Sequence, residues 1–331
     1  MLRMYYIYSF VNQFNKSGIK FFQMRVAVID LGTNTCNLLI AEINSQDYKI
    51  VHQSKQLVKL GDKEIHNNRI SNEAMKRVEK CFSHFKNIIC QYEAEKVRIV
   101  STSAVRDAGN KIEILERLCH QTGWIVKVLT GDKEAQLIFE GVLLALQKLE
   151  EPTVILDIGG GSNELILAEN NAIAWKESKP TGMARVINQF ALSDPIKPEE
   201  LIILQEFFSA RHATAIEKCK SKKVTTLAGC SGAFDTIADV IDKVNPGEKQ
   251  RKKQEISLNH FHRVYESLIY STRGRRVEMK GMDMVRVDLI VPAVIFIQQL
   301  INQIGISKII QTDYALREGV LYEMMSLRLP H

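Results

Sequence analysis

The sequence carries one short unit twice, and this internal repeat limits the possible folds more than any other feature. The first copy reads AVIDLGTNTCNLLIAEI and the second reads VILDIGGGSNELILAEN. When the copies are superposed, an acid, a glycine and a hydroxyl coincide: Asp30 with Asp157, Gly32 with Gly159, and Thr35 with Ser162. Each copy predicts an apolar strand, an Asp-x-Gly turn and a second apolar strand.

A mixed α/β pattern follows the first copy and restarts at the second. At about 100–200 residues per domain, the 331 residues predict two domains. Ser71 is placed to cap a helix, and a second helix opens with Asn110 and Glu113 at capping-box spacing and ends at Gly123. No low-complexity linker separates the halves. We place domain I at residues 24–130 and domain II at 131–331, and we allow for the last helix to pack on domain I.

Residues 1–23 precede the regular pattern. They have neither the apolar core nor the small-residue cleavage site of a signal peptide. We interpret Met24 as the working start, and residues 1–23 as a disordered or wrongly assigned extension. No apolar run approaches the roughly 20 residues of a membrane span. We therefore expect a cytoplasmic protein without a membrane partner.

The composition narrows the class of partner. A formal net charge of +6 is compatible with an anionic ligand but too small to argue for nucleic acid. The six cysteines include no Cys-x-x-Cys pair, which favours small core residues in a reducing compartment. We therefore expect an anionic ligand and no nucleic-acid partner.

The glycines of both turns predict phosphate binding. Glycine allows backbone angles that other residues avoid, so the turn can aim several N–H groups at one point, and Thr or Ser hydroxyls add donors. The segments after the turns, NLLIAEI and ELILAEN, look like strands. Each turn therefore closes a hairpin, unlike the strand-to-helix turns of Walker and dinucleotide folds. Two aligned copies favour phosphate binding over the alternative of two unrelated hairpins.

The acids beside the glycines predict a metal ion. A carboxylate next to phosphate-binding amides repels the ligand unless a cation intervenes, and Mg²⁺ with oxygen ligands suits this position, with Mn²⁺ as an alternative. Glu164 places a second carboxylate near Asp157, whereas its counterpart in the first copy is the neutral Asn37. We therefore expect Asp157 and Glu164 to hold the metal.

Six segments together resemble the exopolyphosphatase/guanosine pentaphosphate phosphohydrolase (Ppx/GppA) family. They are AVIDLGTNTCNLLIAEI, STSAVRDAGN, GDKEAQLIFEGV, LDIGGGSNELIL, LAGCSGAFDTIA and TDYALREGVLYEM, in order from about Met24 to the end. The resemblance implies the fold of the sugar kinase–heat-shock ATPase–actin superfamily. Two actin-like, ribonuclease H-like α/β domains would face each other across a cleft, with one phosphate loop each. The chain resembles the short, two-domain branch of the family.

The resemblance also implies roles for single residues. Glu134, in GDKEA, is implied as the catalytic base, and Arg106, in TSAVRDA, as a phosphate clamp. The implied phosphate-binding residues are those of the two loops: Asp30, Gly32, Thr33, Asn34 and Thr35 in the first, and Gly159, Gly160, Gly161 and Ser162 in the second. For Arg286 and Arg317, ligand contact and a structural salt bridge are equal alternatives. Lys133 and Asn37 depart from the family pattern, and their roles stay open.

The implied activity is hydrolysis of the terminal phosphoanhydride of inorganic polyphosphate, with Mg²⁺ and a water activated by Glu134, in a homodimer. Three alternatives stay open. One is the same chemistry on guanosine pentaphosphate (pppGpp). The others are an ATP-dependent kinase of the superfamily and a non-catalytic protein that binds polyphosphate or an alarmone.

Overall fold

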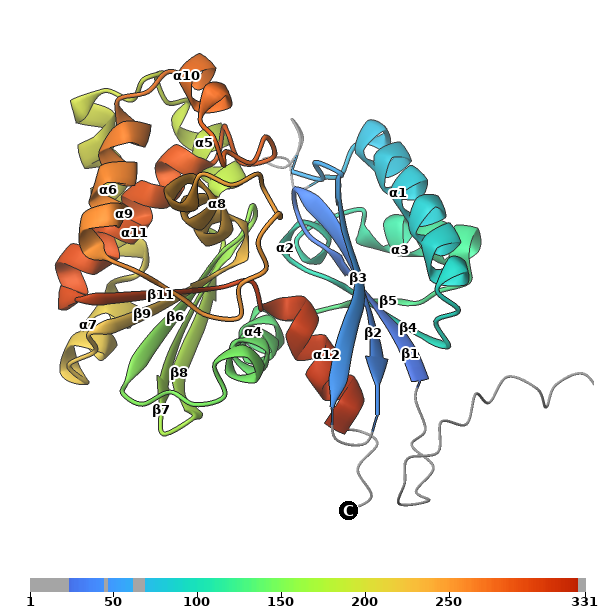
Figure 1. Ribbon diagram of the computed structural model, residues 1–331. Helices are drawn as coiled ribbons and strands as arrows, with labels where there is room; N and C mark the ends of the chain where they lie inside the picture. The colour runs from blue at the N-terminus through green and yellow to red at the C-terminus, as the bar shows by residue number, and fades with distance from the viewer. Residues whose placement is uncertain (1–23, 45–46, 62–68, 327–331) are drawn as a thin grey trace, which may run out of the picture.

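The computed structural model describes residues 24–44, 47–61 and 69–326, so the predictions for residues 1–23 lie outside the described residues. These residues form two sheets that lie side by side, each with its own helices (Figure 1). No helix within these ranges is both long and apolar enough to cross a membrane.

The first sheet has the strand order β3-β2-β1-β4-β5. Its strands are β1 (Met24–Leu31), β2 (Thr35–Ile43), β3 (Tyr48–Leu57), β4 (Lys96–Ser101) and β5 (Val126–Val128). The first three strands form an antiparallel meander, and β4 and β5 run parallel to β1. The repeated sequence unit is the β1–β2 hairpin, as predicted.

The second sheet repeats this arrangement in the order β8-β7-β6-β9-β11, and adds β10 at its edge. Its strands are β6 (Thr153–Ile158), β7 (Asn163–Glu169), β8 (Ala172–Lys179), β9 (Thr226–Cys230), β10 (Gln254–Ile256) and β11 (Lys308–Thr312). Asp30 pairs with Asn37 across one hairpin and Asp157 with Glu164 across the other. The shared order and register confirm the predicted α/β fold of two actin-like domains.

Helices α1 (Asn72–Gln91) and α3 (Lys111–Thr122) cover the outer face of the first sheet (Figure 1). Ser71 caps α1 by accepting a hydrogen bond from the Ala74 amide, as predicted. The predicted capping box at Asn110 is wrong. Its side chain instead bonds both the amide and the carbonyl of Ile70, at 3.1 and 3.0 Å, and so ties two loops together.

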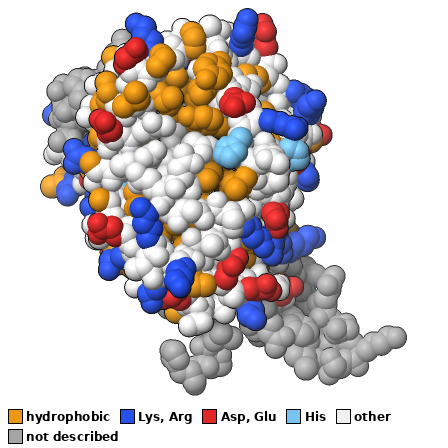
Figure 2. Space-filling view, turned by 90° about the vertical axis from the view of Figure 1, so that its left-hand side faces the viewer, with side chains coloured by type: hydrophobic (Ala, Val, Ile, Leu, Met, Phe, Trp, Pro, Cys, Tyr) orange, Lys and Arg blue, Asp and Glu red, His pale blue; other side chains and the backbone are white. Residues whose placement is uncertain are grey.

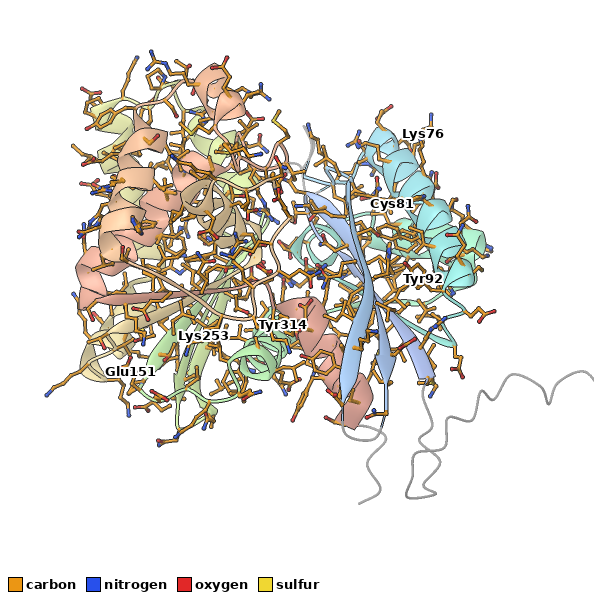
Figure 3. All side chains as sticks on the ribbon, viewed as in Figure 1. Lys76, Cys81, Tyr92, Glu151, Lys253 and Tyr314 are labelled. Atoms are coloured by element: carbon orange, nitrogen blue, oxygen red, sulfur yellow. The ribbon has the colours of Figure 1, made fainter. Side chains whose placement is uncertain are left out.

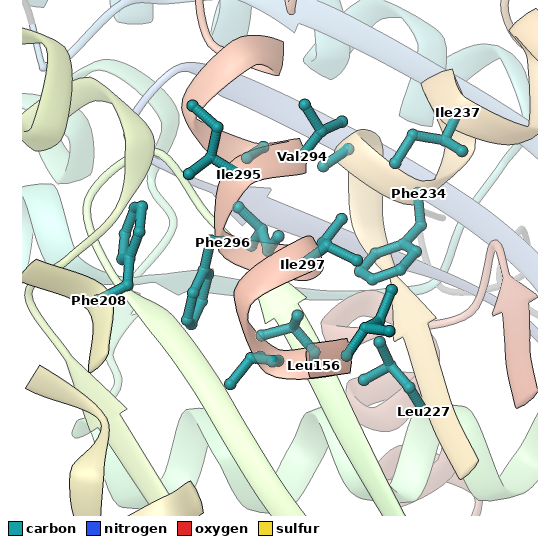
Figure 4. Packing of buried hydrophobic residues seen from close by; sticks show 14 of the residues in the cluster. Leu156, Phe208, Leu227, Phe234, Ile237, Val294, Ile295, Phe296 and Ile297 are labelled. Carbon is teal, nitrogen blue, oxygen red and sulfur yellow. The ribbon is translucent and has the colours of Figure 1, made fainter. Parts of the chain in front are cut away.

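Domain II is covered by a larger group of helices. They are α5 (Met183–Phe190), α6 (Pro198–Arg211), α7 (Ala213–Ser221), α8 (Ser231–Asp242), α9 (Leu258–Ile269), α10 (Arg273–Glu278) and α11 (Ile290–Leu300), which continues as a π-helical turn at Ile301–Gly305. Helix α11 is apolar on nearly all sides and forms the centre of this core (Figure 4). Phe296 stacks on Phe208 with ring centroids 4.5 Å apart. Each such buried side chain contributes about 1.5–3 kcal/mol.

Two helices from opposite ends of domain II, α4 (Gly131–Leu146) and α12 (Leu316–Ser326), lie between the two sheets (Figure 1). Together with both sheets they form one apolar cluster, in which α12 contacts β1 and α4 contacts β8. The two helices touch through backbone. A Cβ on Gly141 would lie 2.0 Å from the Ala315 carbonyl oxygen, and one on Gly319 would lie 1.8 Å from that of Leu137. The domain division at residue 130 stays a prediction.

The outer face of domain II, seen in Figure 2, carries apolar side chains among scattered charges. Helix α6 contributes to the exposed apolar surface with Ile202 and Ile203, which are 54% and 47% exposed. This face lies on the side of domain II away from the other domain (Figures 1 and 2).

Candidate active site

The two repeated turns meet in one cleft of about 720 Å³ between the domains. We call residues 30–35 the first loop and residues 157–162 the second loop. Residues of both loops line the cleft, together with Glu134 and Glu164. The two turns have the same geometry, because the Gly32 amide bonds the Thr35 carbonyl and the Gly159 amide bonds the Ser162 carbonyl, both at 3.0 Å. The sequence repeat is thus a structural repeat at the centre of the molecule.

The second loop turns its amides towards the cleft because its carbonyls are held from behind. The carbonyl oxygens of three glycines accept hydrogen bonds from the start of α5: Gly159 from Met183 at 3.0 Å, Gly160 from Ala184 at 2.9 Å, and Gly161 from Gly182 at 3.3 Å. In a trans peptide the N–H points opposite to the C=O of the same unit. The amides of Gly160, Gly161 and Ser162 therefore face away from α5. No acceptor for them occurs among the described residues, so they are free to bind oxygen atoms of a ligand.

The carbonyls of the first loop are also held by hydrogen bonds, here from the segment after β3. Its Thr33 carbonyl accepts a hydrogen bond from Gly61 at 3.1 Å, and its Asn34 carbonyl accepts from Val58 and Lys59, both at 2.9 Å. The peptide geometry then turns the amides of Asn34 and Thr35 away from this support. Both loops therefore present backbone donors, and they do so on the two sides of one cleft.

The loops also touch. A Cβ built on Gly161 would lie 2.5 Å from the Thr33 hydroxyl oxygen and 2.6 Å from that of Ser103. Any side chain at this glycine would force Thr33 and Ser103 to shift at the point where the loops meet. Glycine is needed here for close approach.

Three carboxylates lie in or beside the loops: Asp157 and Glu164 are buried, and Asp30 is partly buried. Ser231 donates to Asp157 Oδ2 at 2.8 Å, Ser178 donates to Glu164 Oε1 at 2.6 Å, and Asn37 donates to Asp30 Oδ2 at 3.2 Å. Burial raises the pKa of Asp30 and of Asp157 to about 6. Burial, followed by repulsion from neighbouring carboxylates, raises the pKa of Glu164 well above its usual range. This part of the cleft therefore favours bound protons or cations.

The carboxylates fit a divalent cation that is shared with a phosphate. No three His, Cys, Asp or Glu side chains in the described ranges lie close enough to hold a metal by themselves. Mg²⁺, however, is commonly held by one or two carboxylates, several waters and the phosphates of the substrate. The buried Asp30 Oδ1 atom has no hydrogen-bond partner. An unsatisfied carboxylate oxygen beside a phosphate nest fits such a shared ion.

Glu134 lies in the first turn of α4, which Thr130 caps by accepting from the Lys133 amide at 3.2 Å. It is 6% exposed, and burial raises its pKa to about 7 although Arg106 opposes this change. Arg106 donates to Glu134 Oε2 at 2.7 Å and to the Leu129 carbonyl at 3.2 Å. A carboxylate with a pKa near neutrality can both accept and release a proton at physiological pH.

Arg106, predicted as a phosphate clamp, is paired with Glu134 in the structure. Arg106 is absent from the described residues that line the cleft, and its guanidinium is turned to the Glu134 carboxylate. The physical reason is the burial of Glu134, whose charge needs a partner. Arg106 is therefore placed to orient Glu134.

The residues whose roles were open fall into two groups. Lys133 pairs with Glu323 of α12 at 3.0 Å and so serves the packing between helices. Arg286 and Arg317 line the cleft. Arg317 also lies 3.4 Å from a carboxylate oxygen of Glu318, whereas the buried Nε of Arg286 has no partner. Arg286 is therefore the better placed of the two arginines for ligand contact.

Sequence reasoning missed several polar residues of the cleft. Ser231, which binds Asp157, lies in the GCSG turn after β9 with a positive φ of 66°, and this glycine-rich turn was a usable signal. Tyr314 follows Asp313 in the segment TDYALREGVLYEM. It lies where the two domains meet (Figure 3), and its hydroxyl is 3.2 Å from that of Tyr48 in domain I.

Comparisons with a family model and with solved structures both match the chain to the Ppx/GppA phosphatase family. The model of the Ppx/GppA phosphatase family matches residues 39–328. The crystal structure of an exopolyphosphatase from Cytophaga hutchinsonii superposes with a TM-score of 0.87 at 32% identity, covering 92% of this chain and 98% of that one.

Two curated relatives differ in length. Exopolyphosphatase 2 of Mycobacterium tuberculosis is 26% identical over 310 residues, which cover 89% of this chain and 97% of the relative. The bifunctional 3-dehydroquinate synthase/phosphatase of Fusobacterium nucleatum is 28% identical over 90% of this chain. The chain spans 46% of that longer relative.

Proposed function

The chain belongs to the Ppx/GppA phosphatase family, and from this premise we propose that it is an exopolyphosphatase. It would release the terminal phosphate of inorganic polyphosphate by attack of water. The observation that carries the proposal is the pair of amide-lined loops that face each other in one cleft with Glu134. This arrangement can hold a phosphate chain end from two sides with a base beside it.

In the proposed mechanism, the amides of the two loops and the hydroxyls of Thr35 and Ser162 bind the oxygens of the terminal phosphoryl group. Preorganised backbone donors stabilise the charge that develops on these oxygens in the transition state. Arg286 adds a positive charge from the wall of the cleft. Asp157 and Glu164 would hold a divalent cation, proposed as Mg²⁺, which would supply neutralising charge to the phosphate oxygens.

Glu134 supplies the proton chemistry. Its carboxylate accepts a proton from the attacking water, and the raised pKa makes this transfer favourable near neutral pH. Arg106 fixes the carboxylate through the 2.7 Å contact and keeps it ionised often enough to act as a base. The departing phosphate chain leaves along the cleft.

Acidic side chains in the cleft favour short chains as substrates. Asp235, Asp239 and Asp313 line the cleft, as do Lys249 and Arg251. Asp239 is paired with Arg251 at 2.7 Å, so an extended polyanion is repelled by Asp313 and by the ionised fraction of Asp235, whose pKa burial raises to about 7. A nucleotide with a terminal triphosphate avoids this repulsion, so pppGpp is the second candidate substrate.

The test is phosphate release from polyphosphates of graded length, pppGpp and ATP, with and without Mg²⁺ or Mn²⁺. We expect release from short polyphosphate that requires the divalent cation, and release from pppGpp if the second candidate also holds. Binding of polyphosphate without release would contradict catalysis. Phosphorylation of an acceptor by ATP would favour a kinase. We also propose that the protein is a cytoplasmic homodimer. Light scattering of the purified protein measures the mass of the assembly and so tests the dimer.

A further inference from the structure

A chain of four polar side chains lies behind the second loop, on the side away from the cleft. Asn163 Nδ2 donates to the Thr181 carbonyl at 2.7 Å and to the Thr181 hydroxyl at 3.1 Å. The same hydroxyl lies 2.9 Å from His212 Nε2, and His212 Nδ1 lies 2.7 Å from Glu177 Oε1. Asn163 and His212 are completely buried, and Thr181 is 2% exposed. Such a network is costly to bury wherever a polar atom lacks a partner, and Asn163 Oδ1 is one such atom.

The donors and acceptors of this network run in one direction. The Glu177 carboxylate can only accept a hydrogen bond, so His212 Nδ1 carries the proton that is donated to it. In the neutral imidazole, Nε2 then accepts the proton of the Thr181 hydroxyl, whose oxygen accepts from Asn163. The imidazole is held further by Phe296, whose ring centroid is 4.7 Å from that of His212. Thr181 is thereby fixed in position by groups from two strands, β7 and β8, and from two helical segments.

The position of Thr181 matters because the residues directly after it support the second loop. Gly182 and the first two residues of α5 provide the three amides that hold the carbonyls of that loop. Asn163 comes directly after the loop, so the network joins the end of the loop to the start of its support. A displacement of Thr181 would move this support and rotate the peptides of the loop.

We propose that Glu177, His212 and Thr181 form a positioning relay that sets the direction of the second-loop amides. The relay deepens the proposed function, because it rests on the second loop binding the reacting phosphate. It acts through the backbone and touches no ligand. Thr181 is excluded as a nucleophile, although its hydroxyl is paired with an imidazole and a carboxylate as in hydrolases, because it is buried and does not line the cleft.

The first loop is anchored in a different way. Its carbonyls are bonded by the segment that directly continues β3, at Val58, Lys59 and Gly61. Arg77 of α1 holds this support in turn by donating to the Val58 carbonyl at 2.8 Å and to the Lys59 carbonyl at 2.9 Å. The position equivalent to Asn163 is Cys36, whose thiol cannot reproduce the two amide hydrogen bonds. The second loop depends on a helix start, and a helix start needs an anchor.

The test compares Thr181→Val, which removes the hydroxyl at nearly constant volume, with Thr181→Ser, which keeps it. Loss of one preorganised donor costs about 10²–10³ in kcat, and a partial rotation of the loop should cost about 10- to 100-fold. We expect Thr181→Val to lower kcat for phosphate release by that amount with KM changed less than about 3-fold, because the amides matter most in the transition state. Thr181→Ser should restore kcat to within about 3-fold of the wild type.

A matched control is Thr226→Val. Thr226 is also 2% exposed, and its hydroxyl donates to the carboxylate of Glu151. It lies at the opposite end of β9 from the cleft, and Glu151 is at the outer end of domain II (Figure 3). This variant removes the hydroxyl of an equally buried threonine, whose acceptor Glu151 is exposed, without touching the loop. We expect it to lower the melting temperature and to keep kcat within about 2-fold of the wild type.

Amide hydrogen exchange separates the relay from the proposed reaction. In Thr181→Val, and not in Thr226→Val, the amides of Met183 and Ala184 should exchange faster, because their hydrogen bonds to the loop loosen. This readout holds even if the wild type releases no phosphate, an outcome that contradicts the proposed function alone. Unchanged exchange at these two amides, or a folded Thr181→Val protein with wild-type kcat, would overturn the relay. Equal damage by Val and Ser would also overturn it, since the hydroxyl would then be irrelevant.

Discussion

Replacement of Glu134 by Gln is the sharpest test of the assigned base. The amide has nearly the same volume and can still accept the hydrogen bond from Arg106 Nη1, but it cannot take a proton from water. Loss of a positioned general base costs about 10²–10⁴ in rate. This corresponds to about 3–5 kcal/mol of transition-state stabilisation. We expect kcat to fall by that factor while substrate binding stays within a few-fold of the wild type.

The effect on stability should be small because two contributions oppose each other. The variant weakens the ion pair with Arg106, whose side chain is 21% exposed and also bonds the Leu129 carbonyl. It also removes a charge that is 7% exposed and is repelled by Asp157. Breaking a fully buried pair costs about 3–5 kcal/mol, but here an acceptor remains for the arginine. We therefore expect the melting temperature to change by only a few degrees.

Phosphate release under saturating substrate measures kcat, and calorimetric titration of the substrate measures binding. Asp132→Asn is the matched control. Asp132 lies in the same first turn of α4, but its side chain is 75% exposed and pairs with Lys176 at 2.9 Å. Both variants remove one negative charge from the helix N-terminus, which is worth about 0.3–1 kcal/mol. A folded Glu134→Gln protein with normal turnover would refute the assignment, and so would equal inactivation by Asp132→Asn.

Three further variants test the cleft. Gly161→Ala places a Cβ 2.5 Å from the Thr33 hydroxyl, so it should lower kcat/KM by at least about 10-fold, and near-wild-type kinetics would contradict the close contact of the loops. Arg286→Leu should raise KM by about 10-fold or more, because it removes a positive charge from the wall of the cleft. The melting temperature should change little, because Arg286 makes no ion pair among the described residues. An unchanged KM would argue against ligand contact. Burial, followed by repulsion from Asp313, raises the pKa of Asp235 from 3.8 to about 7. Its ionisation therefore destabilises the folded state increasingly as the pH rises from 4 to 7, and Asp235→Asn should raise the melting temperature at pH 8 more than at pH 4. An equal effect at both pH values would contradict this.

Local patterns in the sequence were sufficient to predict the two hairpins and their glycine turns. The period of the strands, the Asp-x-Gly repeat and the cap at Ser71 are all properties of neighbouring residues, and the structure contains each of them. The capping box predicted at Asn110 was wrong because a distant contact outweighed the local pattern. Its side chain found partners at Ile70, forty residues earlier, and these competed successfully with the adjacent helix.

The contact partners of buried side chains could not be predicted from the sequence. Nothing near Arg106 shows that its guanidinium meets Glu134, because the contact joins residues 28 apart through the β5–α4 connection. The relay behind the second loop is a stronger case. Thr181 and His212 come from segments 31 residues apart, and neither lies in a recognisable motif. Such networks become visible only when tertiary packing has set which polar groups share the same buried space.

The phosphate-binding loop occurs twice in the structure, whereas the proposed base, Glu134, occurs once. The two loops have the same turn geometry, and the carbonyls of each are held by hydrogen bonds from its own domain. Glu134 instead belongs to α4, which lies between the two sheets and packs backbone to backbone against α12 through Gly141 and Gly319. Motion of one domain relative to the other would therefore change the distance between the loops and shift Glu134 relative to at least one of them. Catalytic geometry then depends on the packing of this middle layer as much as on the loops. Hence a chain could keep both phosphate loops intact and still lose turnover through a substitution at Gly141 or Gly319, neither of which lines the cleft.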